Sequence, residues 1–96
     1  MRKYEIMFIV KATIESAEVK KTAESFKKLL TDSKAKVSEF KELGEKKLAY
    51  PIKKEINGYY FLVQTEASPE AVNEFDRKAL IDENILRHLI IKLDEE

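Results

Sequence analysis

The chain has 96 residues, enough for one small domain with a single hydrophobic core. Its 18 basic and 18 acidic residues cancel, so it lacks the strong positive charge of a simple nucleic-acid-coating protein. It contains no cysteine, which excludes disulfide bonds and thiolate metal sites.

The first predicted element is a strand at residues 6–10, a continuous apolar run of strand-forming side chains. This run is too short for a signal peptide or a membrane span, so we expect a soluble, cytoplasmic protein without membrane contact. A helix follows, for which Thr13 or Ser16 could supply the N-cap. Its apolar side chains recur at helical spacing, opposite several lysines. They are Val19, Ala23, Phe26 and Leu30.

We expect one long strand over residues 36–53, because apolar and polar residues alternate from Leu48 to Ile52. Gly44 predicts a bend or bulge within it. Pro51 cannot donate a hydrogen bond to a neighbouring strand, so this strand should lie at an edge of the sheet.

Asn57-Gly58 is a strong hairpin signal and predicts a turn before the next strand, at residues 59–65. Ser68-Pro69-Glu70 is typical of a helix start, with a cap, a proline in the first turn and an acidic residue. The inner face of that helix is predicted to carry Val72, Phe75 and Ala79. The last strand is expected at residues 85–93, before a short acidic tail at 94–96.

The predicted order β-α-β-β-α-β gives an α+β fold of the split βαβ, or ferredoxin-like, kind. Because βαβ crossovers are right-handed, both helices should pack on one face of a four-stranded antiparallel sheet. We expect a single domain over residues 1–93, with the proline-containing strand at an edge.

The other face of the sheet should carry large apolar side chains. Three predicted strands, at residues 6–10, 59–63 and 89–91, are apolar at both odd and even positions. An exposed apolar surface of this kind is typical of a partner site. The alternative is that a loop or the tail covers it.

Basic and aromatic residues are interleaved. Seven lysines lie between residues 34 and 54, against three glutamates. Lysine and arginine neutralise phosphates and tyrosine stacks on bases, so the pattern is compatible with RNA binding, although solvated lysines are common on strand edges. Tyr60 is a further tyrosine of this pattern. The candidate RNA or partner contacts are Arg2, Lys3, Tyr4, Lys46, Lys47, Leu48, Tyr50, Lys54, Tyr59, Arg87 and Lys92.

The sequence offers no enzyme signature. With only Gly44 and Gly58, it has no glycine-rich phosphate loop. The loop at residues 11–14 lacks the arginine that acylphosphatases of this fold use. His88 stands alone in an apolar strand, so we interpret it as a packed or interface residue and not as a metal ligand. We therefore expect neither catalysis nor a metal or other cofactor.

From Met1 to Lys92 the chain resembles the bacterial small-subunit ribosomal protein six family. The shared motifs are Met1-Arg2-Lys3-Tyr4-Glu5, Leu43-Gly44, Lys46-Lys47-Leu48-Ala49-Tyr50-Pro51-Ile52, Asn57-Gly58-Tyr59-Tyr60 and Ile81-Asp82-Glu83-Asn84-Ile85-Leu86-Arg87. His88 is a departure, since some relatives have an apolar residue there.

The resemblance implies a structural role in the cytoplasmic small ribosomal subunit. It also implies cooperative binding to small-subunit ribosomal RNA together with small-subunit ribosomal protein eighteen. By this likeness the RNA or partner contacts are Arg2, Tyr4, Lys54, Arg87 and Lys92. The edge from Leu48 to Tyr50 and the helix-free sheet face are candidates for the protein partner.

Two other functions stay open at this point. One is a small-molecule regulatory domain of the same topology, which dimerises and needs a ligand pocket near residues 11–14. The other is a single-strand binder similar to RNA-recognition motifs, whose glycine-aromatic strand residues 57–63 partly match. For the ribosomal function we expect no small-molecule substrate and a monomer when free.

Overall fold

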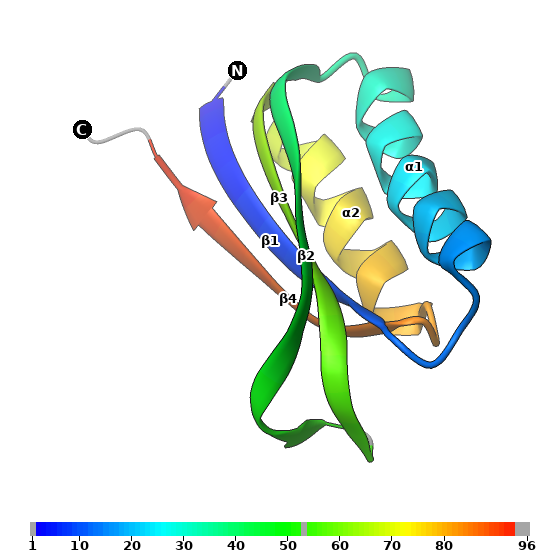
Figure 1. Cartoon of the computed structure of the whole chain (residues 1–96). Helices are drawn as coiled ribbons and strands as arrows, with labels where there is room; N and C mark the ends of the chain where they lie inside the picture. The colour runs from blue at the N-terminus through cyan, green and yellow to red at the C-terminus, as the bar shows by residue number, and fades with distance from the viewer. Residues whose placement is uncertain (1, 53, 94–96) are drawn as a thin grey trace.

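A computed structural model describes residues 2–52 and 54–93 and contains six elements in the predicted order (Figure 1). They are β1 (Arg2–Lys11), α1 (Ser16–Asp32), β2 (Lys36–Ile52), β3 (Glu55–Ala67), α2 (Pro69–Ile81) and β4 (Ile85–Lys92). All pairings are antiparallel, and the sheet order is β2-β3-β1-β4. Both helices lie on one face of the sheet. The predicted ferredoxin-like α+β fold is confirmed; the predicted tail at 94–96 lies outside the described residues.

The main core lies between the sheet and the helices. Phe8 of β1 stacks on Phe61 of β3, with ring centroids 5.2 Å apart. Phe26 of α1 and Phe75 of α2 meet at 4.8 Å and both contact Phe8. All four rings are fully or almost fully buried. The helical spacing in the sequence therefore identified the faces that pack on the sheet.

The two helices begin differently. In α2, the predicted cap is confirmed, because the Ser68 hydroxyl accepts a hydrogen bond of 3.2 Å from the Ala71 amide. In α1, the cap position is Glu15, whose side chain makes no capping hydrogen bond. The predicted caps Thr13 and Ser16 are wrong: Ser16 is already helical, and the Thr13 hydroxyl donates to Glu55 Oε2 at 3.3 Å. Neither helix in the described part of the chain is long and apolar enough to cross a membrane.

The long strand β2 lies at the edge of the sheet, where Pro51 predicted it. Its register shifts between Glu42 and Gly44, and Gly44 has φ +94°, a conformation that glycine adopts without strain. The predicted bulge near Gly44 is confirmed. Residue 53, the last residue of the predicted strand, lies outside the described part.

The hairpin turn does not fall at Asn57-Gly58, as the sequence predicted. Both residues lie inside β3, and Gly58 pairs with Lys46 on one side and Lys11 on the other. A Cβ atom at Gly58 would lie 2.4 Å from Cγ2 of Ile9, so the glycine is required by close packing and not by a turn. The chain turns between the end of β2 and Glu55, with Lys54 at φ +67°.

Candidate interaction surface

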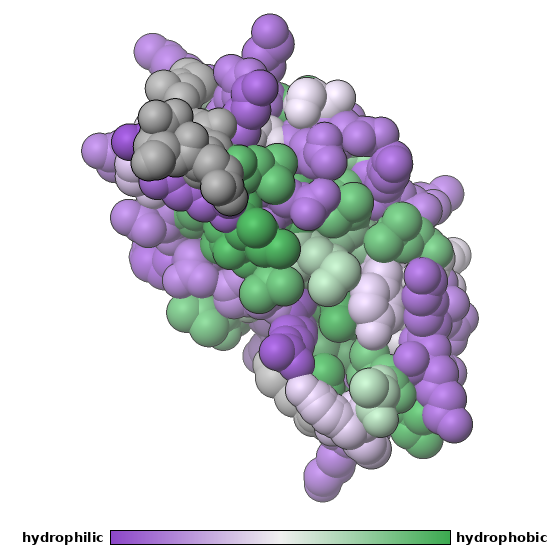
Figure 2. All heavy atoms as spheres, turned by 90° about the vertical axis from the view of Figure 1, so that its left-hand side faces the viewer, coloured by the Kyte–Doolittle hydropathy of each residue, from purple (hydrophilic) through white to green (hydrophobic). Residues whose placement is uncertain are grey.

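The face of the sheet without helices, hereafter the open face, carries the alternate residues of each strand. Met7 of β1 is opposite Leu62 of β3 and Leu89 of β4, whereas its neighbours Ile6 and Phe8 are in the main core. Figure 2 looks onto this face and shows hydrophobic side chains gathered across it. Leu89 is 46% exposed, so an apolar surface is available to another molecule. The apolar residues of the open face are Met7, Ile9, Tyr60, Leu62, Leu89 and Ile91.

The end of β2 covers one part of the open face. Between the pairs Lys47–Asn57 and Ile52–Glu55, four residues of β2 stand opposite a single residue of β3. This extra length lets Leu48 pack against Ile9 and Leu86, where it is only 6% exposed. The sequence had suggested Leu48 as a partner contact; its burial makes it an internal anchor of the strand end instead.

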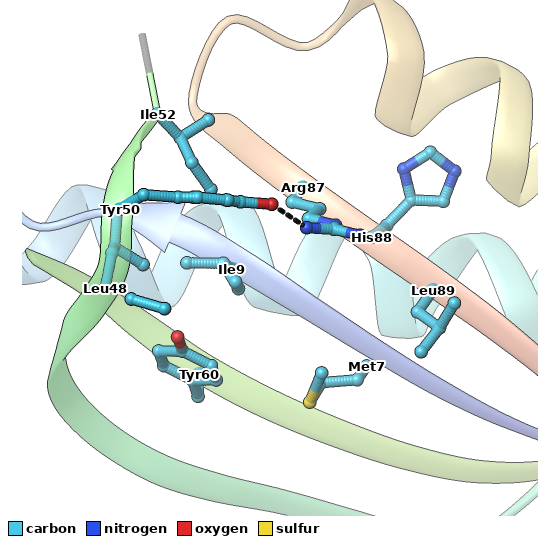
Figure 3. A pocket seen from close by; sticks show the side chains of 10 residues that line it. Met7, Ile9, Leu48, Tyr50, Ile52, Tyr60, Arg87, His88 and Leu89 are labelled. Carbon is cyan, nitrogen blue, oxygen red and sulfur yellow. Dashed lines mark hydrogen bonds between the residues drawn. The ribbon is translucent and has the colours of Figure 1, made fainter. Parts of the chain in front are cut away.

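A hollow of about 220 Å³ remains beside this strand end. Arg87 lines it, and Nη1 donates a hydrogen bond of 2.5 Å to the Tyr50 hydroxyl (Figure 3). None of the described residues that line the hollow carries a carboxylate. They are Met7, Ile9, Leu48, Ala49, Tyr50, Ile52, Tyr60, Arg87, His88 and Leu89. The hollow can therefore accept an apolar group of another molecule, and Arg87 places one positive charge beside that group.

The predicted cationic contacts fall into two groups. Lys46 has its ammonium 5.8 Å from the Tyr60 ring centroid, near the hollow, while Lys47 and Lys54 are exposed on the β2–β3 hairpin. The other group lies at the opposite end of β1. Its members are Arg2 and Lys3, at the start of β1, and Lys92, which pairs with Tyr4. The structure thus brings Lys46, Tyr50 and Arg87 together, and separates them from Arg2 and Lys92.

Two predicted tyrosines are not on the open face. Tyr4 and Tyr59 are partly buried against the main core on the helix side. In β3, Tyr59 and Phe61 both point to the helices, and only Tyr60 between them faces the open side. The predicted set had Tyr59 as a contact because residue types alone do not distinguish the two faces of a strand.

His88 is packed, as its position in an apolar strand predicted. Its side chain is 13% exposed and lies on the helix side, with Nε2 2.6 Å from Oδ1 of Asp76 on α2. This contact ties β4 to α2 directly behind Arg87. Within the described residues, no group of His, Asp and Glu side chains could hold a metal ion.

The predicted site residues do not include six apolar residues of the open face, although the apolar pattern contained a signal for them. Alternation with the buried core residues identifies Met7, Ile9, Tyr60, Leu62, Leu89 and Ile91. The contact between Tyr50 and Arg87 had no local signal, since the two residues are 37 positions apart.

Comparison with known proteins agrees with this architecture. The family model for ribosomal protein S6 matches residues 3–92. Among solved structures, the 30S ribosomal protein S6 of Thermotoga maritima is similar, with a TM-score of 0.90 and 26% identity. The match covers 95% of this chain and 86% of that one. The chain therefore belongs to the ribosomal protein S6 family, whose members are structural components of the small ribosomal subunit in the cytoplasm.

Proposed function

We propose that the chain binds small-subunit ribosomal RNA together with small-subunit ribosomal protein eighteen, as a structural component without catalytic activity. The observation that carries this proposal is the open face: apolar side chains of β4 are exposed on it, and Lys46 and Arg87 lie toward one end. Arg2 and Lys92 lie at the other end of β1, at positions whose register is that of the helix side. A macromolecular partner can cover the apolar part while its phosphates are neutralised at the ends.

We assign the protein partner to the exposed apolar part of the open face, along β4 and the adjoining β1. Leu89 and Ile91 are 46% and 43% exposed on β4, next to the partly buried Met7. Burying such side chains supplies about 25 cal/mol per Å² of apolar surface, which RNA phosphates cannot exploit. An apolar surface of protein eighteen is the better match for this region.

The RNA backbone is assigned to the cations. Arg2, Lys92 and Arg87 are exposed, and a backbone phosphate can accept hydrogen bonds from each of them. Because the chain is neutral overall, we expect weak RNA binding by the free monomer. Tight binding then requires the positive charge and the contact area that the partner adds.

The two other functions lack a supporting observation. Recognition of single-stranded RNA in the manner of an RNA-recognition motif needs stacking aromatics on the open face of β3. There, only Tyr60 of the three aromatics at 59–61 faces outward. A regulatory domain needs a ligand pocket after β1. The hollow there, beside Ala12 and Thr13, is lined by the charged residues Glu45, Lys54 and Glu55, and the more apolar hollow lies between β2 and β4.

The proposal is tested by measuring binding of the purified chain to a central-domain fragment of small-subunit ribosomal RNA, with and without protein eighteen. The double variant Arg2→Ala/Arg87→Ala should keep its fold and bind the RNA at least tenfold more weakly in the presence of the partner. The matched control is Arg77→Ala on α2, where the guanidinium is paired with Glu74 at 3.0 Å. Unchanged RNA affinity of the double variant at moderate salt would contradict the proposal.

A further inference from the structure

The end of β2 is held over the open face at two points. Leu48 is buried against Ile9 and Leu86, and Ile52 packs against the same cluster. Tyr50 lies between these two anchors and is 50% exposed. Because the residues on both sides of Tyr50 are fixed, its phenol group has a defined place above the sheet.

The Tyr50 hydroxyl and Arg87 come from opposite edges of the sheet. The two residues belong to β2 and β4, the two edge strands, with β3 and β1 between them. Arg87 Nη1 donates to the Tyr50 hydroxyl at 2.5 Å, and Figure 3 shows the phenol ring extending across the face toward it. The bond depends on the extra residues of β2, since a regularly paired strand would not reach over the sheet.

The charge of Arg87 is not neutralised within the described part of the chain. Arg77 on α2 is paired with Glu74, whereas Arg87 has no carboxylate partner there and lies beside a hollow with no acidic lining. A guanidinium has five N–H donors, and the contact to Tyr50 uses one of them. The hydroxyl that accepts this bond keeps its own hydrogen and can donate it to a further acceptor.

We propose that Tyr50 and Arg87 form one anion-binding unit, in which Tyr50 positions the guanidinium for a backbone phosphate of RNA. Arg87 supplies the charge and up to two parallel N–H donors, the geometry that phosphate oxygens accept. Tyr50 is a positioning residue, and its free hydroxyl hydrogen adds a donor on the same side. The inference rests on the proposed RNA-binding function and assigns a specific role within it.

Positioning has a measurable consequence for affinity. A free arginine side chain samples many rotamers, and ordering it on binding weakens affinity. In this protein the tyrosine orders it beforehand. Loss of the hydroxyl should therefore weaken RNA binding about two- to tenfold, the range expected for one immobilised long side chain.

The test is a double-mutant cycle on RNA affinity, measured with the full chain and protein eighteen bound to the central-domain RNA fragment. Tyr50→Phe removes only the hydroxyl and should weaken binding about two- to tenfold. In the Arg87→Gln background the same change should have almost no effect, because the positioned group is gone. Arg87→Gln alone should also reduce, by about one unit, the steepness with which the logarithm of the RNA association constant falls with the logarithm of salt concentration.

Arg77→Gln on α2 is the matched control, since it removes an arginine from the helix side, where the guanidinium is paired with Glu74 at 3.0 Å. It should bind RNA like the wild type. Arg87→Lys keeps the charge without the planar group, and its RNA affinity should lie between those of the wild type and Arg87→Gln. If Arg87→Gln fails to fold, Arg87→Lys takes its place in the cycle.

Three results separate the possible failures. If Tyr50→Phe binds like the wild type while Arg87→Gln binds weakly, the positioning role is wrong and the proposed function stands. An equal loss from Tyr50→Phe in both Arg87 backgrounds also overturns the inference, because Tyr50 then acts independently. If the wild-type chain with its partner does not bind the RNA fragment, the proposed function itself is wrong.

Discussion

The two faces of the sheet use alternate residues of the same strands for different purposes. On the helix side, Phe8 and Phe61 stack 5.2 Å apart and are almost fully buried. On the open side, Met7 and Leu62 are opposite one another at the next position, partly exposed, beside the exposed Leu89. Neighbouring residues of β1 thus differ in burial because helices cover only one face. The helix side therefore contributes most of the core, and the open side leaves apolar side chains exposed.

The open face is itself divided. The end of β2 buries Ile9 and Leu48 in a second, smaller cluster, whereas Leu89 and Ile91 on β4 stay exposed. Coverage by the protein's own strand therefore reaches only one end of the face. What differs between the two ends is the local length of β2, which places four residues opposite one of β3.

The largest effect is expected from the core of the helix side. Phe8→Ala should lower the free energy of unfolding by about 3–5 kcal/mol, because it leaves a cavity among Phe26, Phe61 and Phe75. Met7→Ala, one residue away on the open face, should lower it by no more than about 1 kcal/mol. Urea denaturation of both variants measures the difference. Equal losses would contradict the division of the sheet into two faces.

An intermediate loss of stability is expected at Gly58, which packs closely against Ile9 at the covered end of the open face. Gly58→Ala should lower the free energy of unfolding by about 1–3 kcal/mol, since its Cβ would lie 2.4 Å from Ile9 Cγ2. In an Ile9→Ala background the same substitution should cost less, because the obstructing side chain is absent. The comparison variant Gly44→Ala meets no atom within 4 Å but is strained at φ +94°. Ile9→Ala should not reduce the loss of unfolding free energy caused by Gly44→Ala. If Ile9→Ala reduces the losses from Gly58→Ala and Gly44→Ala equally, the steric explanation of Gly58 is wrong.

The smallest effect on stability is expected at the exposed end of the open face. Leu89→Gln should change the free energy of unfolding by about 0.5 kcal/mol or less, as is usual for exposed positions. It should nevertheless weaken binding of protein eighteen about tenfold, through loss of buried apolar contact. Leu80→Gln on α2, where the leucine is 69% exposed, is the control and should leave binding unchanged. Calorimetric titration with protein eighteen distinguishes the two variants.

The element order could be predicted from the sequence because hydrophobic periodicity differs sharply between the helices and the strands. Pro51 also predicted the edge position of β2, and Gly44 its bulge. The hairpin was misplaced since an Asn-Gly pair is typical of tight turns, while here Gly58 is required by the approach of Ile9. That approach is a contact between strands far apart in sequence, and no local pattern contains it.

The candidate site was only partly predictable for the same reason. The apolar character of the open face followed from strands that are hydrophobic at both parities. The burial of Leu48 and the bond between Tyr50 and Arg87 depend on how far the end of β2 reaches over the sheet. Tyr59 was included among the contacts because its side-chain type fits RNA; its register against Val10 turns it to the helices.

The central claim is that the open face, and not the helix side, binds the other molecules of the small subunit. Methyl NMR tests it most directly, by following the methyl signals of the wild-type chain as protein eighteen and the RNA fragment are added together. We predict large shifts for Met7, Leu89 and Ile91 on the open face, and none for Leu80 and Ile81 at the end of α2. Shifts confined to Leu80 and Ile81 would place the interface on the helix side and contradict the account.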